Sequence, residues 1–263
     1  MPSCRFEAGG SVKSQLFNFS ATSRDDLYAN LKSVDIAVPL ISEGRKKWQR
    51  ERYTISRFIA TAARESLLQF PVEIKHQDET ELGPDFYLSF FNVRIGIECV
   101  DAVPQELYRI EELRETEYPD ELMWGQRYFP KERRYTDEER IEIASGQRVG
   151  TPWMPAMAKR DWLEAMHFFI DDKARKRSKG NYGSSVETWL LVEDAWPTPL
   201  RVYPESVRGA AVQLSEELTH SSMGHGFNAI YILSGTQLIR VAPGNIQAVV
   251  LEDLWHVPPT EQC

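Results

Sequence analysis

Residues 83–101 read GPDFYLSFFNVRIGIECVD, and the fold that we expect is inferred from them. It holds two runs rich in aromatic and β-branched residues, 86–91 and 93–99, with a short turn between them. Such runs are typical of strands, so the stretch predicts a β-hairpin. Each strand also brings one acid that the apolar pattern does not require. Asp85 opens the first strand and Glu98 lies near the end of the second.

The two acids are candidate metal ligands. Side chains alternate between the faces of a strand, so Glu98 shares its face with Val100. The opposite face is wholly apolar and carries Val93, Ile95, Ile97 and Cys99. Acids on adjacent antiparallel strands can converge on one cation, because Mg²⁺ often takes only one or two protein carboxylates. The structural alternative is that Asp85 caps a turn and Glu98 pairs with an arginine at the margin of the sheet.

The dipeptide Pro-Asp ending at Asp85, the hairpin turn and the run IECV that contains Glu98 form a recognisable set. It resembles the motif of the PD-(D/E)XK phosphodiesterase superfamily, the restriction-endonuclease-like nucleases. The resemblance implies that Asp85 and Glu98 bind catalytic Mg²⁺ or Mn²⁺, helped by the Cys99 carbonyl. It also implies a lysine two residues after the Glu that orients the attacking water. Val100 occupies that position here, and some members of the family carry this lysine on a neighbouring helix instead.

A third acid lies on the helix that we expect before the hairpin. Residues 45–69 show a helical period, with a buried stripe made of Trp48, Ile55, Phe58, Ile59 and Ala62. Glu51 falls within this stripe. The resemblance implies a Glu on this helix near the metal, which makes Glu51 a candidate that orients a metal-bound water. The alternative is an ion pair with Lys47 along the helix.

The missing lysine is sought on a second helix, at residues 162–176. Lys173 and Lys176 lie one turn apart at the edge of its apolar side. Either could supply the catalytic ammonium, and Lys173 is preferred because it is nearer the body of the helix. The alternative reading is electrostatic, since the C-terminal turn of a helix attracts cations through its dipole.

The remaining apolar runs predict the rest of a mixed sheet. Residues 71–76 form a short strand before the hairpin, and residues 188–194 and 227–233 are buried strands that flank a helix at 205–220. Strand, helix and strand in this order indicate a parallel pair with a right-handed crossover. Residues 237–241 are expected to add the final edge strand.

We therefore expect one α/β domain over residues 1–263, with a mixed central sheet flanked by helices. The resemblance implies a restriction-endonuclease-like core. Residues at about 104–165 read as a largely helical insertion, and within them residues 104–148 carry twelve acids against eight bases. Such a segment is compatible with a lid over a site and with a purely structural cap.

Composition limits the classes of function. The net charge is −8, but six basic residues and one acid lie within 45–57, and five basic residues and no acid lie within 173–179. We expect these segments to contact a nucleic-acid backbone. Cys4, Cys99 and Cys263 are too few and too scattered for a disulfide framework. No apolar run is long enough for a membrane helix, so the expected location is cytoplasmic, without membrane association.

The expected function is metal-dependent hydrolysis of nucleic-acid phosphodiester bonds, with DNA preferred over RNA as substrate. A homodimer is compatible with this expectation. One rival is a catalytically inactive member of the same fold, in which Val100 marks lost catalysis, acting as a nucleic-acid- or protein-binding module. The other rival is an interaction protein that engages a basic partner through the acidic residues 104–148.

Overall fold

The computed structural model describes residues 17–77, 83–121, 126–130, 134–148, 150, 154–179, 187–220 and 226–255. Cys4, Cys263 and parts of the expected insertion lie outside these residues. Cys99 is buried and has a free thiol. None of the described helices combines the length and the apolar composition that a membrane crossing requires.

An eight-stranded mixed sheet forms the centre of the fold, and its strands follow one another in chain order. The first four strands form antiparallel pairs, β4, β5 and β6 are parallel, and the last three are antiparallel again. The strands are β1 (Asn18–Ala21), β2 (Val72–His76), β3 (Phe86–Phe90), β4 (Val93–Ala102), β5 (Glu187–Asp194), β6 (Ala229–Ser234), β7 (Gln237–Ala242) and β8 (Asn245–Val250).

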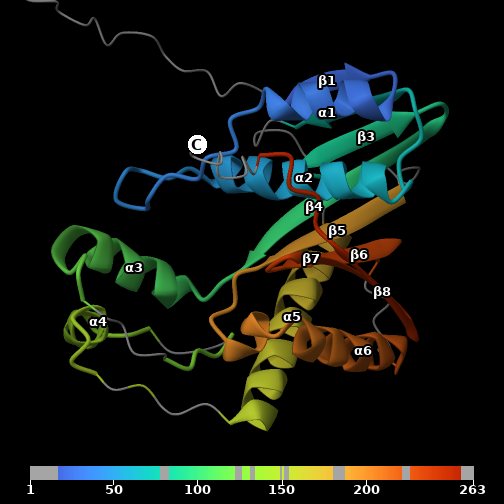
Figure 1. Ribbon diagram of the computed structural model, residues 1–263. Helices are drawn as coiled ribbons and strands as arrows, with labels where there is room; N and C mark the ends of the chain where they lie inside the picture. The colour runs from blue at the N-terminus through green and yellow to red at the C-terminus, as the bar shows by residue number, and fades with distance from the viewer. Residues whose placement is uncertain are drawn as a thin grey trace, which may run out of the picture.

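Helices cover both faces of this sheet (Figure 1). They are α1 (Arg24–Lys32), α2 (Lys47–Arg64), α3 (Gln105–Glu117), α4 (Asp137–Ala144), α5 (Pro155–Lys179) and α6 (Pro204–His220). Helix α2 lies on one face, α5 and α6 lie on the other, and α3 and α4 follow beyond the end of β4. The predicted α/β class with a mixed, helix-flanked sheet is thus confirmed.

The apolar pattern of the sequence explains the layers. Ile55, Phe58 and Ile59 of α2 are fully buried against the sheet, as the helical stripe predicts. On the other face, Trp162 and Met166 of α5 are fully buried in a second cluster with residues of α6. The central strands lie between the two clusters, which explains why their sequences are nearly continuous apolar runs.

The predicted faces of β4 are also found. Ile95, Ile97 and Cys99 belong to the cluster beneath α2, whereas Val100 packs on the cluster beneath α5. Glu98 and Val100 therefore face α5, and Cys99 faces α2. A lysine carried on α5 would therefore approach β4 from the face on which Val100 lies.

One expectation about the edges of the sheet is wrong, and one edge was not predicted. Residues 237–241 are not the final edge strand, because β8 pairs with β7 on its outer side. At the other edge, β1 and α1 form from residues for which the sequence predicted no element. These elements are short, and β1 has a mixed burial pattern without a clear alternation, so periodicity alone gives little signal there.

The expected insertion contains α3, α4 and the beginning of α5. Glu106 on α3 is buried and joins the two smaller helices, because its carboxylate accepts hydrogen bonds at 2.8 Å from Arg109 and 2.9 Å from Arg140. Arg127 makes a two-pronged ion pair with the buried Asp161 of α5. Glu106 therefore holds α3 and α4 together, and Asp161 connects the described part of the segment to α5.

Candidate functional site

The candidate site lies where β3 and β4 part. Their last pair is Phe86 with Ile97, so β4 continues past the start of β3 without a partner on this side among the described strands. Asp85 immediately precedes β3, and its Oδ2 accepts a hydrogen bond of 2.7 Å from the backbone N–H of Cys99. The carboxylate takes the place of the missing strand partner. This contact fixes Asp85 beside Glu98.

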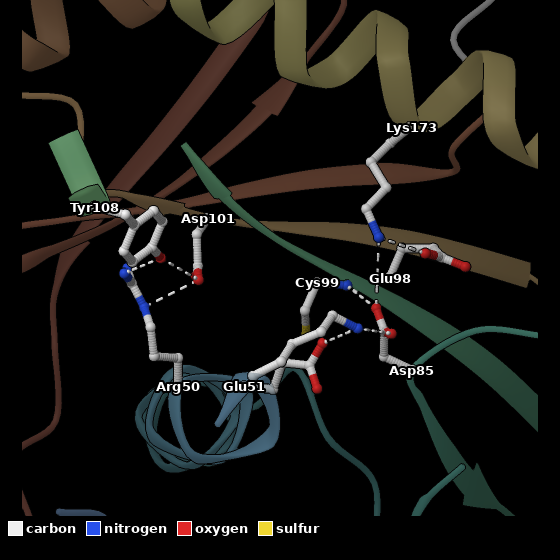
Figure 2. A network of polar contacts seen from close by, with 9 residues as sticks. Arg50, Glu51, Asp85, Glu98, Cys99, Asp101, Tyr108 and Lys173 are labelled. Carbon is white, nitrogen blue, oxygen red and sulfur yellow. Dashed lines mark hydrogen bonds and ion pairs between the residues drawn. The ribbon is translucent and has the colours of Figure 1, made fainter. Parts of the chain in front are cut away.

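Lys173 brings α5 to this point (Figure 2). Its Nζ donates a hydrogen bond of 2.9 Å to Glu98 Oε2 and lies 3.6 Å from Asp85 Oδ2. The side chain of Lys173 is 18% exposed and that of Glu98 is 6% exposed. Of the two predicted lysines, Lys173 is the one whose ammonium meets both acids.

Helix α2 contributes an acid and a second ammonium from the other face of the sheet. Lys47 Nζ lies 2.6 Å from Glu51 Oε1 and 3.4 Å from Asp85 Oδ1. The pair of Glu51 with Lys47, foreseen as the structural alternative for Glu51, is therefore present. Lys47 also joins Glu51 to Asp85, so the structural contact and proximity to the candidate site coexist.

The first turn of α2 breaks an ordinary rule of helix composition. Acids stabilise the positive N-terminal end of a helix, yet this turn contains none and begins with a lysine. Lys47 is balanced by Glu51 and Asp85 instead. Departures of this kind concentrate at functional sites, and this one places an ammonium beside the candidate ligands.

Burial and charge set the protonation of the cluster. Burial of Glu51 and the negative charge of Asp85 raise the pKa of Glu51 to about 7, although Lys47 acts against both. Burial disfavours the charged form of Lys173, but the acids Asp85 and Glu98 outweigh it and raise the pKa of Lys173. The ammonium of Lys173 therefore remains protonated at neutral pH, as a hydrogen-bond donor and a fixed positive charge.

The site offers few protein oxygen atoms to a Mg²⁺ ion. Among the residues that the structure describes, no group of three or more His, Cys, Asp or Glu side chains is close enough together to hold a metal ion. Glu98 Oε1 is nevertheless buried without a hydrogen-bond partner. Mg²⁺ needs only one or two carboxylates when water and phosphate complete its shell. Asp85, Glu98 and the Cys99 carbonyl fit that requirement.

Lys176 lies outside the cluster. Its side chain is 66% exposed, and its Nζ is 2.7 Å from Asp172 Oδ2. Asp172 also pairs with Arg175. The contacts of Lys176 agree with the alternative of a basic last helical turn.

Internal ion pairs neutralise part of the two basic segments. In residues 45–57, for example, Arg50 Nε lies 2.9 Å from Asp101 Oδ2, and Arg52 lies 3.9 Å from Asp35. In residues 173–179, Lys173 is held by the acids of the site. Formal charge along the chain therefore overstates the positive charge that these segments present to a nucleic-acid backbone.

A second polar network adjoins the first along α2 (Figure 2). Arg50 pairs with Asp101 and donates a hydrogen bond to the hydroxyl of Tyr108, which lies 3.5 Å from Asp101 Oδ2. The sequence prediction did not single out Arg50 or Asp101. A signal was present for Asp101, which lies two residues after Cys99 and so shares its face of β4.

Comparison of the chain with protein-family models, with curated proteins and with solved structures finds no match. The geometry of these residues is therefore the basis for an assignment of function.

Proposed function

We propose that the protein is a metal-dependent nuclease that hydrolyses phosphodiester bonds in nucleic acid, with Mg²⁺ or Mn²⁺ as cofactor and DNA as the preferred substrate. The core in this proposal is restriction-endonuclease-like. Its metal ligands are Asp85, Glu98 and the Cys99 carbonyl, and its catalytic lysine is Lys173, which takes over the role of the residue replaced by Val100.

The observation that carries the proposal is the position of Lys173. Lys173 of α5 reaches between an acid that immediately precedes β3 and an acid of β4, 3.6 Å from Asp85 and 2.9 Å from Glu98. The two acids lie where β3 and β4 part, beside the part of β4 that has no partner on this side among the described strands. The unpartnered Oε1 of Glu98 gives the cluster one oxygen that no protein group satisfies among the described residues.

Each residue has a distinct part in the proposed reaction. Asp85 and Glu98 hold the cation, which when bound polarises the phosphate and lowers the pKa of water. Lys173 donates a hydrogen bond to the attacking water or to a phosphate oxygen. Glu51 orients that water from the α2 side, and Lys47 fixes the position of Glu51 through their 2.6 Å contact.

The proposal is tested by cleavage of supercoiled plasmid and of single-stranded DNA with Mg²⁺ or Mn²⁺. We expect Asp85→Asn, Glu98→Gln and Lys173→Met to lose activity by about 100-fold or more, because removal of metal-ion catalysis costs several kcal/mol. Lys176→Met is the matched control, since it makes the same substitution on the same helix outside the cluster. Equal nicking by all five proteins would assign the activity to a contaminant.

The same assay decides about the inactive alternative. Salt-sensitive binding of DNA by the wild type, without cleavage in either metal, identifies a binding module with lost catalysis. Absence of both binding and cleavage at low salt favours a protein partner for the acidic residues 104–148.

A further inference from the structure

A pocket of about 710 Å³ lies beside the candidate site, on the α2 face of the sheet. Its lining includes Arg45, Arg50, Tyr53 and Thr54, the carboxyl group of Glu193, and the apolar segment 36–38. The proposed reaction uses none of these side chains. Their chemistry combines an apolar wall, an aromatic ring, two hydrogen-bonding groups and two guanidinium groups, which is what a nucleotide requires from a binding site.

The pocket is close to the proposed metal ligands. Glu193 on β5 is the strand partner of Asp101 on β4, which lies two residues beyond Cys99. Two residues of a parallel strand span about 6.6 Å, and neighbouring strands are about 4.8 Å apart, so Glu193 lies roughly 8 Å from Cys99 along the sheet. The pocket can therefore hold a base adjacent to the phosphate at the candidate site.

The two hydrogen-bonding groups inside the pocket are weakly engaged. Thr54 Oγ1 donates a long hydrogen bond of 3.4 Å to Glu193 Oε2. Thr54 is buried in α2, which fixes its hydroxyl group. A carboxylate that accepts and a hydroxyl that donates form a complementary pair for an amino group next to a ring nitrogen. Cytosine offers N4–H₂ beside N3, and adenine offers N6–H₂ beside N1. Thymine and uracil have a carbonyl group where these bases have the amino group.

The guanidinium groups line the same pocket. Arg50 is held by Asp101 at 2.9 Å, and Arg45 by the Pro39 carbonyl at 2.6 Å. Both side chains are mostly buried, at 15% and 20% exposure. Each guanidinium group is held in place by an internal partner. Its remaining N–H groups are therefore already oriented to bind a phosphate of the nucleotide.

We propose that this pocket binds an unpaired cytosine or adenine of the substrate, next to the scissile phosphate, with Glu193 accepting from the exocyclic amino group and Thr54 donating to the adjacent ring nitrogen. The inference rests on the proposed nuclease function and makes its substrate single-stranded at this position, because the edge that is read is the one that base pairing occupies. Glu193 and Thr54 are then specificity-determining residues.

The test is equilibrium binding of labelled oligodeoxycytidylate, oligodeoxyadenylate and oligodeoxythymidylate, measured by fluorescence anisotropy above neutral pH without divalent cation. We expect the wild type to bind the first two about tenfold more tightly than the third, as one good hydrogen-bonded pair to a base provides. Glu193→Gln should make the three affinities nearly equal. The Gln amide can donate a hydrogen bond to the thymine carbonyl and can accept one from the amino group of cytosine or adenine.

Glu187→Gln is the matched control, since Glu187 is an exposed residue at the other end of β5. It should keep the preference of the wild type. Equal wild-type affinities, a preference that survives Glu193→Gln, or no binding of any oligonucleotide would each overturn the assignment of the pocket. Metal-dependent cleavage without base preference overturns this inference alone. Base-selective binding without cleavage in Mg²⁺ or Mn²⁺ overturns the nuclease and leaves the pocket.

Discussion

Lys173 Nζ donates a 2.9 Å hydrogen bond to Glu98 Oε2, although 75 residues separate the two in the chain. The contact joins α5 to β4 in a largely buried environment. Burial of an ion pair costs free energy because both charges lose their hydration. Removal of only one partner is strongly destabilising, because it leaves the other charge buried and unpaired. The same two residues therefore govern both the stability of the fold and the proposed chemistry.

The first prediction concerns this pair. Lys173→Met leaves Glu98 and Asp85 with one ammonium fewer, and Glu98→Gln leaves Lys173 with one acid fewer. Each change should lower the free energy of unfolding by about 3 kcal/mol. In the double variant the free energy of unfolding should fall by clearly less than the sum of the two single losses, because no unpaired charge remains at position 98. Urea denaturation of the four proteins measures this coupling, and strictly additive effects would contradict a direct interaction.

The second prediction concerns metal affinity. Lys173 lies between the acids that are proposed to hold the cation, so its positive charge competes with metal binding. Lys173→Met should therefore bind Mn²⁺ more tightly than the wild type while it cleaves more slowly. Asp85→Asn should lose binding. Isothermal titration calorimetry gives the affinities, and thermal stabilisation by the metal gives an independent measure.

Lys176→Met provides the reference in that experiment, because Lys176 pairs with Asp172 and lies outside the cluster. It should bind Mn²⁺ as the wild type does. A gain in affinity in both lysine variants would indicate a general effect of surface charge, and would remove Lys173 from its proposed place.

Local patterns in the sequence were sufficient for the central strands and for the two faces of β4. Alternation placed Glu98 opposite Cys99, and the helical stripe placed Glu51 on the buried side of α2. Periodicity could not place Lys173, because the contact depends on how α5 crosses the sheet, and this angle follows from packing over the whole interface. The short β1 and β8 depend on pairing with β2 and β7, so little of their signal is local.

The same limit explains the parts of the site that the sequence did not reveal. Arg50 was counted as one charge in a basic segment, whereas its partners Asp101 and Tyr108 belong to β4 and α3. Glu193 lies at the polar end of an apolar strand, so its place in the sequence gives no sign of a pocket. Its proximity to Thr54 follows only from the packing of α2 on β5. Ion pairs and pockets between distant segments require the tertiary structure.

The third prediction concerns Asp194, a fully buried acid of β5. Its Oδ2 accepts hydrogen bonds of 2.9 Å from Trp162 Nε1 and 2.6 Å from Ser234 Oγ, so it ties α5 and β6 to β5. Asp194→Ala should lower the free energy of unfolding by about 3 kcal/mol or more, because two buried donors lose their acceptor. Asp194→Asn keeps one acceptor oxygen and should cost less.

Asp171→Ala on the exposed side of α5 is the comparison for Asp194, and we expect little effect from it. Urea denaturation with an unchanged slope would show that both states keep their compactness. If Asp194→Ala were as stable as Asp171→Ala, the hydrogen bonds of Asp194 would not contribute to stability.

The last prediction concerns pH. Burial raises the pKa of Glu193 from 4.5 to about 7, and repulsion by Asp101 adds to this while Arg57 acts against it. Below the unfolded pKa of 4.5 the carboxyl is protonated in both states, so it has no effect on the pH dependence. Between pH 4.5 and 7 the folded state binds more protons than the unfolded state, and stability falls as pH rises. Above pH 7 the full penalty remains, which is at most about 3 kcal/mol for a shift of this size.

Glu193→Gln removes this ionisation, so it should have little pH-linked effect at about pH 4 and should stabilise the protein relative to the wild type at about pH 8. Glu51 also has a pKa of about 7, but it is present in both proteins and cancels in their difference. Thermal unfolding of the two proteins across this range decides the matter, and a constant gap between Glu193→Gln and the wild type would mean that Glu193 ionises as readily in the folded protein as in the unfolded chain.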